Sequence, residues 1–187
     1  ALLENLTLTG SGDIAGTGND GDNVLNGSTS SGANVLAGGM GNDTYWIGLG
    51  DTVVEAANAG NDTVMFAASG THQLSDYAHV ENMTLAHTAG ASGLIGDASA
   101  NVVRGNSSAN TLSGGGGNDV LWGMNGHDVL DGGSGEDTMH GGIGSDTYYV
   151  DSVGDIVIEH YNSGTDRVYS AIDYALGDNG LSRDPCG

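Results

Sequence analysis

Between residues 96 and 149 the sequence repeats every nine residues. Each nine-residue unit opens with a glycine and carries an apolar side chain seven residues later. The opening glycines are Gly96, Gly105, Gly114, Gly123, Gly132 and Gly141, and the apolar residues are Val103, Leu112, Leu121, Leu130, Met139 and Tyr148. A unit of nine residues is too short for a domain and too regular for a loop. We therefore expect each unit to be one layer of a structure whose layers stack on one another.

Each unit divides into a turn and a strand. The first six residues, such as GGSGED at 132–137, are rich in glycine, because tight turns need positive φ angles and close backbone approach. The last three, such as TMH at 138–140, form a short strand with one inward apolar residue. Two units then make one coil of eighteen residues, and strands of successive coils pair in parallel on two faces. The sequence predicts an all-β protein, a parallel β-roll (right-handed β-solenoid) of nonapeptide repeats.

The sixth place of the most regular units holds an aspartate. The series is Asp119, Asp128, Asp137 and Asp146, and Asp155 continues the count by one unit. Residues that meet in successive coils are eighteen apart, so Asp119, Asp137 and Asp155 share one edge of the roll, while Asp128 and Asp146 share the other. Stacked carboxylates repel one another when partly desolvated, so a cation or protons must lie between the turns. Oxygen ligands without a thiol or imidazole cluster favour Ca²⁺ over zinc or copper, and roomy turns suit Ca²⁺ better than Mg²⁺.

These units resemble the glycine-rich nonapeptide of the RTX proteins, whose pattern is G-G-x-G-x-D-x-U-x. The match is strongest over residues 114–149, where the one departure is Met124 in place of the second glycine. The resemblance implies that Ca²⁺ lies between turns eighteen residues apart, held by sixth-place aspartates and turn carbonyls. It implies one ion between 114–119 and 132–137, another between 123–128 and 141–146, and a third closed by Asp155 over Asp137. The turn residues implied besides the aspartates are Gly114, Gly116, Gly123, Asn125, Gly133, Gly135, Gly142 and Gly144.

Two upstream units keep the period but change the sixth residue. Asn101 and Asn110 stand where the later units have aspartate. An asparagine can stack in the same way but brings no charge. We expect weak metal sites or none at these two units.

A longer repeat overlies the short one. GGMGNDTYWIGLGDTVVEAANAGNDTV at 38–64 parallels GGIGSDTYYVDSVGDIVIEHYNSGTDRV at 141–168, and ENLTL at 4–8 parallels ENMTL at 81–85. This predicts two tandem modules. The first module, 1–85, has a short irregular roll. The second, 86–180, contains the regular roll 96–149. Longer strands over 47–85 cap one roll and start the next. Residues 181–187 fit neither repeat, and are either native or left from cloning.

The longer repeat also carries acids outside the nonapeptides. Asp43 fills the sixth place of the full turn at 38–43, and Asp51 follows it. Glu55 and Asp62 in the first module parallel Glu159 and Asp166 in the second. These residues either complete a metal site at the end of each roll or are solvated charges at strand edges.

Composition agrees with a chain that is built around metal outside the cell. The sequence has 24 acidic residues, three basic ones and a formal net charge of −21, so the bare chain repels nucleic acid, anionic membranes and acidic polysaccharides. With 35 glycines and few large apolar side chains, the repeats should be largely disordered without metal. For a site with a Kd of about 10⁻⁴ M, about 1 mM Ca²⁺ stabilises the fold by roughly 1.4 kcal/mol, whereas cytosolic Ca²⁺ contributes almost nothing.

Three functions fit this sequence. The first is a calcium-dependent folding and export module, similar to the repeat modules of secreted bacterial epimerases, proteases and lipases, which commonly leave the cell through a type I machine. The second is a calcium-dependent glycan-binding or adhesive module that contacts a polysaccharide or cell surface. The third is the C-terminal appendage of a polysaccharide-modifying or hydrolytic enzyme.

Catalysis by this chain itself is not expected. No nucleophile is paired with a base, the six histidines have no ligand spacing, and no apolar run is long enough to span a bilayer. We expect a piece of a longer protein. The aromatic residues that could stack on a sugar, or instead close the apolar end of each roll, are Tyr45, Trp46, Tyr148, Tyr149, Tyr161 and Tyr169.

Overall fold

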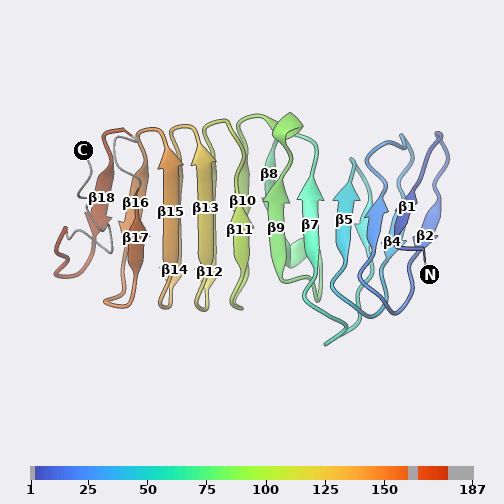
Figure 1. Ribbon diagram of the computed structural model, residues 1–187, viewed down its shortest axis with the longest axis horizontal. Coiled ribbons are helices and arrows are strands. Elements are labelled where there is room, and N and C mark those ends of the chain that lie inside the picture. The colour runs from blue at the N-terminus through green and yellow to red at the C-terminus, as the bar shows by residue number, and fades with distance from the viewer. Residues whose placement is uncertain (1–2, 160–163, 177–187) are drawn as a thin grey trace, which may run out of the picture.

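The chain winds into an all-β parallel solenoid. The computed structural model describes residues 3–159 and 164–176. Strands stack side by side along the long axis, from β1 and β2 at one end to β17 and β18 at the other (Figure 1). Every pairing between the named strands is parallel. The predicted parallel roll is confirmed.

One face of the solenoid is a single nine-stranded sheet, and the opposite face is divided into two sheets. The nine strands are, in order, β1 (Asn5–Thr7), β3 (Val24–Asn26), β5 (Thr44–Ile47), β7 (Thr63–Phe66), β9 (Asn82–Leu85), β11 (Val102–Arg104), β13 (Val120–Asn125), β15 (Thr138–Ile143) and β17 (Ile156–Ile158).

The opposite face has three strands, β2 (Ala15–Thr17), β4 (Val35–Ala37) and β6 (Thr52–Val53), followed by a six-stranded sheet. The six are β8 (Thr71–Gln73), β10 (Gly93–Ile95), β12 (Thr111–Gly116), β14 (Val129–Ser134), β16 (Thr147–Val150) and β18 (Arg167–Ser170). Two 3₁₀ turns, η1 (Leu74–Asp76) and η2 (His87–Ala89), lie in the long connections near the middle of the chain.

The core is a row of apolar side chains between the two faces. The six apolar residues predicted from the nine-residue period are all fully buried. Like residues lie over like: Leu121 pairs with Met139 in the nine-stranded sheet, and Leu112 with Leu130 on the opposite face. Burial of each such side chain contributes about 1.5–3 kcal/mol, so in the regular roll the period fixes the register and supplies apolar stabilisation in every unit.

Coil length separates the two halves of the solenoid. In the regular roll successive sixth-place residues are 18 apart, as for Asp119 and Asp137. In the first half the spacing varies, from 17 between Asn34 and Asp51 to 20 between Asn23 and Asp43. The first half is thus irregular in length, as predicted, although it still winds as coils.

The prediction of longer strands over 47–85 is wrong. Strands that lie within that stretch have two to four residues, whereas β12, β13, β14 and β15 have six each. The reason is register: a constant coil of eighteen residues keeps even the turn residues opposite one another, as in the pairing of Gly115 with Gly133. Where coil length changes, the turns no longer match and the pairing stops at the strand.

The nine-stranded sheet is continuous through residue 85, because β9 pairs with both β7 and β11. The two predicted modules therefore lie on one shared sheet, and the boundary between them stays a prediction. Residues 181–187 lie outside the described residues.

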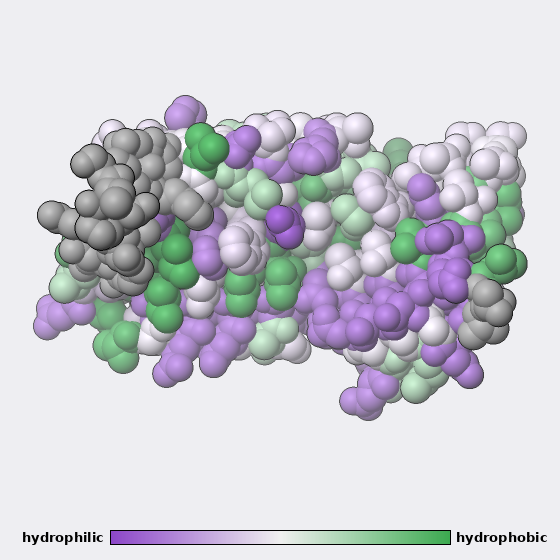
Figure 2. All heavy atoms as spheres, in the orientation of Figure 1, coloured by the Kyte–Doolittle hydropathy of each residue, from purple (hydrophilic) through white to green (hydrophobic). Residues whose placement is uncertain are grey.

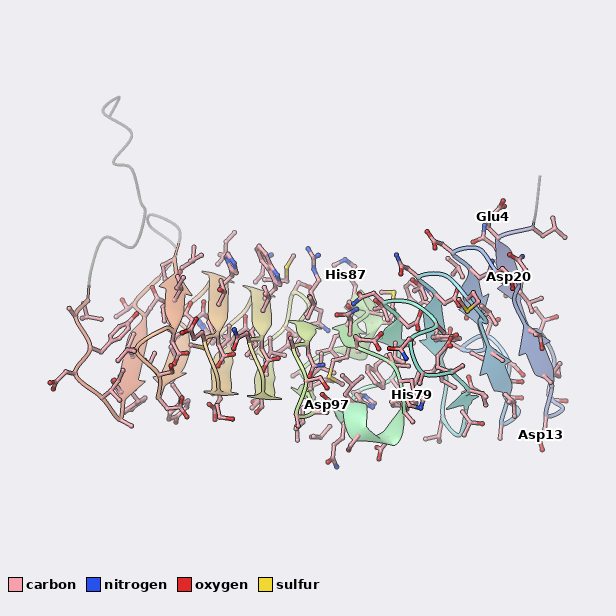
Figure 3. All side chains as sticks on the ribbon, turned by 90° about the horizontal axis from the view of Figure 1, so that it is seen from below. Glu4, Asp13, Asp20, His79, His87 and Asp97 are labelled. Atoms are coloured by element: carbon pink, nitrogen blue, oxygen red, sulfur yellow. The ribbon has the colours of Figure 1, made fainter. Side chains whose placement is uncertain are left out.

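Polar side chains cover much of the outside. Hydrophilic residues form a band along the lower side of the face in Figure 2, and exposed apolar residues form small separate groups. Glu4, Asp13, Asp20 and Asp97 lie on the outside of the solenoid (Figure 3). Among the described residues, none of the helical segments is long and apolar enough to cross a membrane.

Candidate metal centre

The sixth-place residues form a hydrogen-bonded column along each edge of the roll. On the edge that leads into the nine-stranded sheet, the Asn101 N–H donates to Asp119 Oδ1 (2.7 Å) and the Asp119 N–H donates to Asp137 Oδ1 (2.7 Å). The Asp137 N–H donates in turn to Asp155 Oδ1 (3.1 Å). The structure therefore brings Asp119, Asp137 and Asp155 together as the eighteen-residue spacing predicts.

The second column lies on the opposite edge. The Asn110 N–H donates to Asp128 Oδ1 (2.7 Å), and the Asp128 N–H donates to Asp146 Oδ1 (2.8 Å). The Asp146 N–H then donates to Asp166 Oδ1 (2.9 Å), twenty residues further on. The nine-residue count alone did not place Asp166 in this column, because the intervening coil is two residues longer than the regular ones.

Each ladder bond uses only one carboxylate oxygen. Within the part of the chain that the structure describes, the other oxygen, Oδ2, is buried and has no hydrogen-bond partner in six aspartates: Asp43, Asp62, Asp119, Asp128, Asp137 and Asp146. An unsatisfied buried oxygen, and especially a charged one, costs free energy. These six atoms are therefore the strongest structural indication of a ligand.

The free oxygens face backbone carbonyls of the next coil. A Cβ built on Gly114 would collide with Asp119 Oδ2 and would lie 2.5 Å from the Gly132 carbonyl oxygen. A Cβ on Gly123 would lie 2.6 Å from Asp128 Oδ2 and 2.6 Å from the Gly141 carbonyl oxygen. Gly114 and Gly123 thus leave room in which a carboxylate oxygen and a carbonyl oxygen of the next coil converge. Hard oxygen donors of this kind are those that Ca²⁺ takes, so the residues present fit the ion.

At the same place in the two upstream units, the asparagine side chains form hydrogen bonds with the chain. Asn101 Oδ1 accepts the Asp97 N–H (2.9 Å) from its own turn, and its Nδ2 donates to the Glu81 carbonyl oxygen (2.9 Å) of the previous coil. Asn110 Oδ1 likewise accepts the Asn106 N–H (2.8 Å). The predicted stacking of the asparagines is therefore confirmed, and it leaves no charge to neutralise. Their weak metal binding stays a prediction.

Burial dominates the electrostatics of the aspartate columns. It raises the pKa of Asp119 to about 6 and the pKa of Asp128 to about 7, and the charges of Asp137 and Asp146 respectively add to these increases. Burial also raises the pKa values of Asp137 and Asp146 above the usual range. These four carboxylates therefore favour either a proton or a cation near neutral pH.

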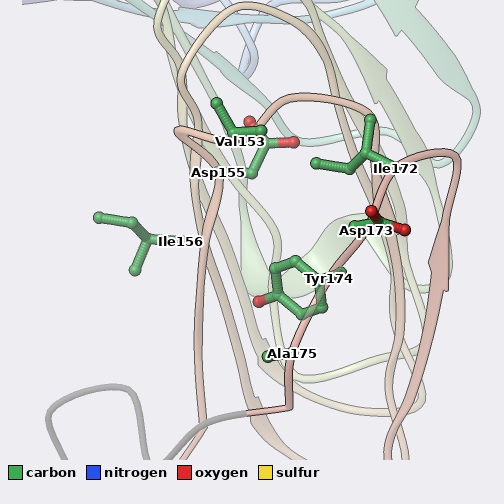
Figure 4. A pocket seen from close by; sticks show the side chains of 7 residues that line it. All are labelled: Val153, Asp155, Ile156, Ile172, Asp173, Tyr174 and Ala175. Atoms are coloured by element: carbon green, nitrogen blue, oxygen red, sulfur yellow. The ribbon is translucent and has the colours of Figure 1, made fainter.

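Two predicted ligands have both oxygens occupied by the chain. Asp155 Oδ2 accepts the N–H groups of Asp151 (3.1 Å) and Ser152 (3.0 Å), and Asp51 Oδ2 accepts the Gly48 N–H (2.8 Å). Each closes its own loop in this way. Asp155 also lines an open pocket of about 460 Å³ with Asp173 and Tyr174 at the end of the solenoid (Figure 4). A third ion between Asp137 and Asp155 stays a prediction.

The predicted glycine ligands take up the expected turns. Gly133, Gly135, Gly142 and Gly144 all have positive φ angles, while Gly116 and Asn125 pair with Ser134 and Ile143 of the next coil. Sequence reasoning missed the carbonyls of Gly132 and Gly141, which share the space beside Gly114 and Gly123 with Asp119 Oδ2 and Asp128 Oδ2. The signal was present, because both residues open the unit eighteen residues after Gly114 and Gly123.

The acids that recur outside the nonapeptides come together with two sixth-place aspartates. One carboxylate oxygen each from Asp43, Glu55 and Asp62 lies within 4.8 Å of the others, and Asp146, Glu159 and Asp166 form a second such group. Burial, with the charges of Asp62 and Asp43 adding to it, raises the pKa of Glu55 to about 7.

The aromatic residues have mixed environments. Tyr45 and Tyr148 are fully buried in the core. Tyr149 and Tyr169 are close to half exposed and stack on each other with ring centres 5.3 Å apart. Tyr161 lies outside the described residues. On the outer face of the nine-stranded sheet, Trp122 and His140 stack with ring centres 3.7 Å apart.

Comparison with known proteins agrees with this geometry. The sequence model of the RTX calcium-binding nonapeptide repeat matches residues 17–54, 95–130, 114–148 and 122–157, which together span more than half of the chain. A search of curated proteins found no match. The first of the four stretches falls in the half where the sequence pattern is weakest, and there too the chain forms coils. The chain belongs to the RTX calcium-binding nonapeptide repeat family.

Proposed function

We propose that this chain is a calcium-dependent folding module of a larger secreted bacterial protein, without chemistry of its own. The observation that carries the proposal is the set of six buried aspartate Oδ2 atoms for which the described residues provide no hydrogen-bond partner. Ca²⁺ removes both the repulsion between stacked carboxylates and the cost of burying them. Without the ion, the same carboxylates oppose folding.

Folding of the module depends on the free calcium concentration of the compartment. At the high free Ca²⁺ outside the cell its sites fill and the solenoid folds, whereas in the cytosol the chain stays open. A chain that folds only after export is suited to passage through a type I secretion machine and then stabilises the protein to which it is attached. The parent is a secreted hydrolase or polysaccharide-modifying enzyme, and the sequence of the complete gene tests this assignment.

Calcium titration of the whole chain tests the folding role. Circular dichroism should show a transition from disorder to β-structure as Ca²⁺ is added, and calorimetry should show several coupled binding events. Asp119→Ala and Asp128→Ala, one on each edge, should each reduce the cooperativity. A chain already folded in chelator, or unchanged titrations in both variants, would contradict the proposal.

A pocket favours glycan binding as a second candidate function. It has a volume of about 440 Å³, and its lining includes Trp46, Thr84, His87 and Arg104. Trp46 gives this pocket an aromatic ring, and Arg104, Thr84 and His87 give it hydrogen-bonding groups, a set suited to hold a sugar. Retention on a glycan array in Ca²⁺, lost in Trp46→Ala and Arg104→Ala, tests this candidate. Equal retention of the two variants and the parent chain counts against it.

A further inference from the structure

Two sites in this chain depart from the two-turn arrangement of the regular roll. In the roll, the space beside the opening glycine contains a carboxylate oxygen and a carbonyl of the next coil, as at Gly114 and Gly123. At Gly141 a Cβ would instead collide with, or lie closest to, three side-chain oxygens: Tyr148 Oη, Asp146 Oδ2 and Glu159 Oε1. At Gly38 the closest oxygens are Asp43 Oδ2 and Tyr45 Oη. Side chains therefore occupy the place that a turn carbonyl holds elsewhere.

A buried tyrosine positions the glutamate at each of these sites. The Tyr45 hydroxyl donates a hydrogen bond to Glu55 Oε1 and accepts the Gly38 N–H (2.7 Å). The Tyr148 hydroxyl donates a hydrogen bond to Glu159 Oε1 in the same way. Because both tyrosine rings are fully buried in the core, each hydroxyl holds its half-buried glutamate against the solenoid.

The aspartates at these sites supply an independent indication of a ligand. Asp43 is 1 % exposed, Asp62 0 % and Asp146 1 %. In each of the three, Oδ2 is buried and has no hydrogen-bond partner among the described residues. These atoms belong to the two groups in which three carboxylate oxygens lie within 4.8 Å of one another. Three carboxylates at that separation repel strongly unless a cation lies between them.

We propose that Asp43, Glu55 and Asp62 bind one calcium ion, that Asp146, Glu159 and Asp166 bind another, and that each glutamate replaces the carbonyls of a missing glycine-rich turn. The sequence explains the replacement. The six residues that end at Asp62 are ANAGND, and those that end at Asp166 are YNSGTD. Neither stretch contains the G-G-x-G turn that precedes an aspartate in the regular units. A coil that lacks the turn also lacks its carbonyl ligands. In each of these longer coils a glutamate supplies the missing oxygen beside the opening glycine. Ca²⁺ accepts such a set because it takes six to eight oxygens in flexible geometry.

The inference rests on the proposed function for the identity of the ion and shares Asp43, Asp62 and Asp146 with it, but the two glutamates belong to this inference alone. It gives the first half of the chain a strong site, although that half has one full nonapeptide turn. In each of the long coils, 43–62 and 146–166, the bound calcium ion also links the first aspartate to the last.

The test compares Glu55→Gln, Glu159→Gln and the double variant with the parent chain and with Glu4→Gln, which changes an exposed glutamate. Equilibrium dialysis with radioactive calcium counts the bound ions, and circular dichroism follows folding. Each single variant should lose one ion or weaken one site by roughly tenfold or more, and the double variant should lose two. Glu4→Gln should bind as the parent does. A double variant with the parent's stoichiometry and affinity overturns the inference.

A second pair of variants covers the case in which the glutamine variants fail to fold. Glu55→Asp and Glu159→Asp keep the charge but shorten the side chain by one methylene, which withdraws the oxygen from the site. Weaker binding at one site per variant supports the inference, and unchanged binding overturns it. If Asp119→Ala and Asp128→Ala lose ions while the glutamate variants do not, the proposed function stands and this inference fails.

Discussion

Asp119 and Asp137 lie in successive coils, and the backbone N–H of Asp119 donates to Asp137 Oδ1 at 2.7 Å while the Asp119 Oδ2 has no partner among the described residues. One carboxylate thus does two tasks. The Oδ1 of Asp119 accepts the Asn101 N–H and so continues the hydrogen-bonded column along the edge. Its second oxygen, Oδ2, is positioned to bind a cation. The two tasks can be separated by substitution.

Asp119→Asn should separate them, because Asn101 shows that an asparagine at this place is satisfied by the chain. Without calcium the variant should be more stable than the parent by about 1–3 kcal/mol, since a buried unsatisfied carboxylate is removed. With calcium it should bind one ion fewer and lose cooperativity. Circular dichroism in chelator measures the first effect as a larger fraction of β-structure, and equilibrium dialysis with calcium measures the second. Asp20→Asn, which changes an exposed aspartate, is the control, and equal ion counts for Asp119→Asn and the parent would refute the assignment.

The calcium-free chain should become less stable as pH rises through the range of the raised pKa values. Asp119 has a folded pKa of about 6 and Asp128 of about 7, against roughly 3.9 in the unfolded chain. The folded state therefore binds more protons between about pH 4 and 7. The stability from these groups is fully present below the unfolded pKa and is lost as pH rises through the folded one.

Circular dichroism of calcium-depleted protein should accordingly show more β-structure at pH 5 than at pH 8. Protons compete with calcium for the same oxygens, so the apparent calcium affinity should fall as pH drops below about 7, and binding near neutral pH should release protons. Calorimetry in buffers of different ionisation enthalpy measures that release. Binding without proton exchange across this range would show that the columns are already ionised.

The nine-residue period predicted the regular roll closely, since it states directly which residues lie inward and which pair. Leu121 over Met139 and Asp119 over Asp137 both follow from counting eighteen. Counting fails where coil length varies. Asp166 lies twenty residues after Asp146, so no fixed interval places it in the column.

The hydroxyl partners could not be predicted from the period either. Tyr148 occupies a core position that any apolar residue could fill, and only the structure shows its hydroxyl beside Glu159. The parallel between Tyr45 with Glu55 and Tyr148 with Glu159 was visible in the longer repeat. That parallel shows that the residues recur together, but it does not show that they touch.

Gly133→Ala should disrupt the stacking of the turns. Gly133 has a φ of 82°, and a Cβ there would collide with the carbonyl oxygen of Gly115 in the previous coil. The left-handed conformation alone costs about 1–2 kcal/mol for a residue with a side chain, and the collision adds to it. We expect the calcium-bound chain to lose about 2 kcal/mol or more in urea unfolding. Gly12→Ala is the matched control because a Cβ there meets no atom within 4 Å, and equal losses in both variants would contradict this account.

Met124 offers the reverse change. It occupies the place of the second glycine with a φ of 83°, where the neighbouring units have Gly115, Gly133 and Gly142 at φ angles of 103°, 82° and 101°. Met124→Gly relieves the same left-handed strain but removes a half-buried side chain. The calcium-bound variant should therefore stay within about 1 kcal/mol of the parent. A loss as large as that of Gly133→Ala, measured in the same urea series, would show that the methionine side chain has a packing role that outweighs its strain.

Leu121→Ala tests how far the core and the metal columns depend on each other. Leu121 is fully buried between Val103 and Met139 in the apolar row, so its truncation should cost about 2–5 kcal/mol of unfolding free energy in calcium. Because Asp119 lies two residues before it, the loosened coil should also bind calcium more weakly, although no ligand has changed. Val102→Ala removes a side chain that is 41 % exposed on the adjacent strand and should cost less than about 1 kcal/mol. If Leu121→Ala loses stability but keeps the parent's calcium affinity, the columns are held by their own hydrogen bonds and do not depend on the core.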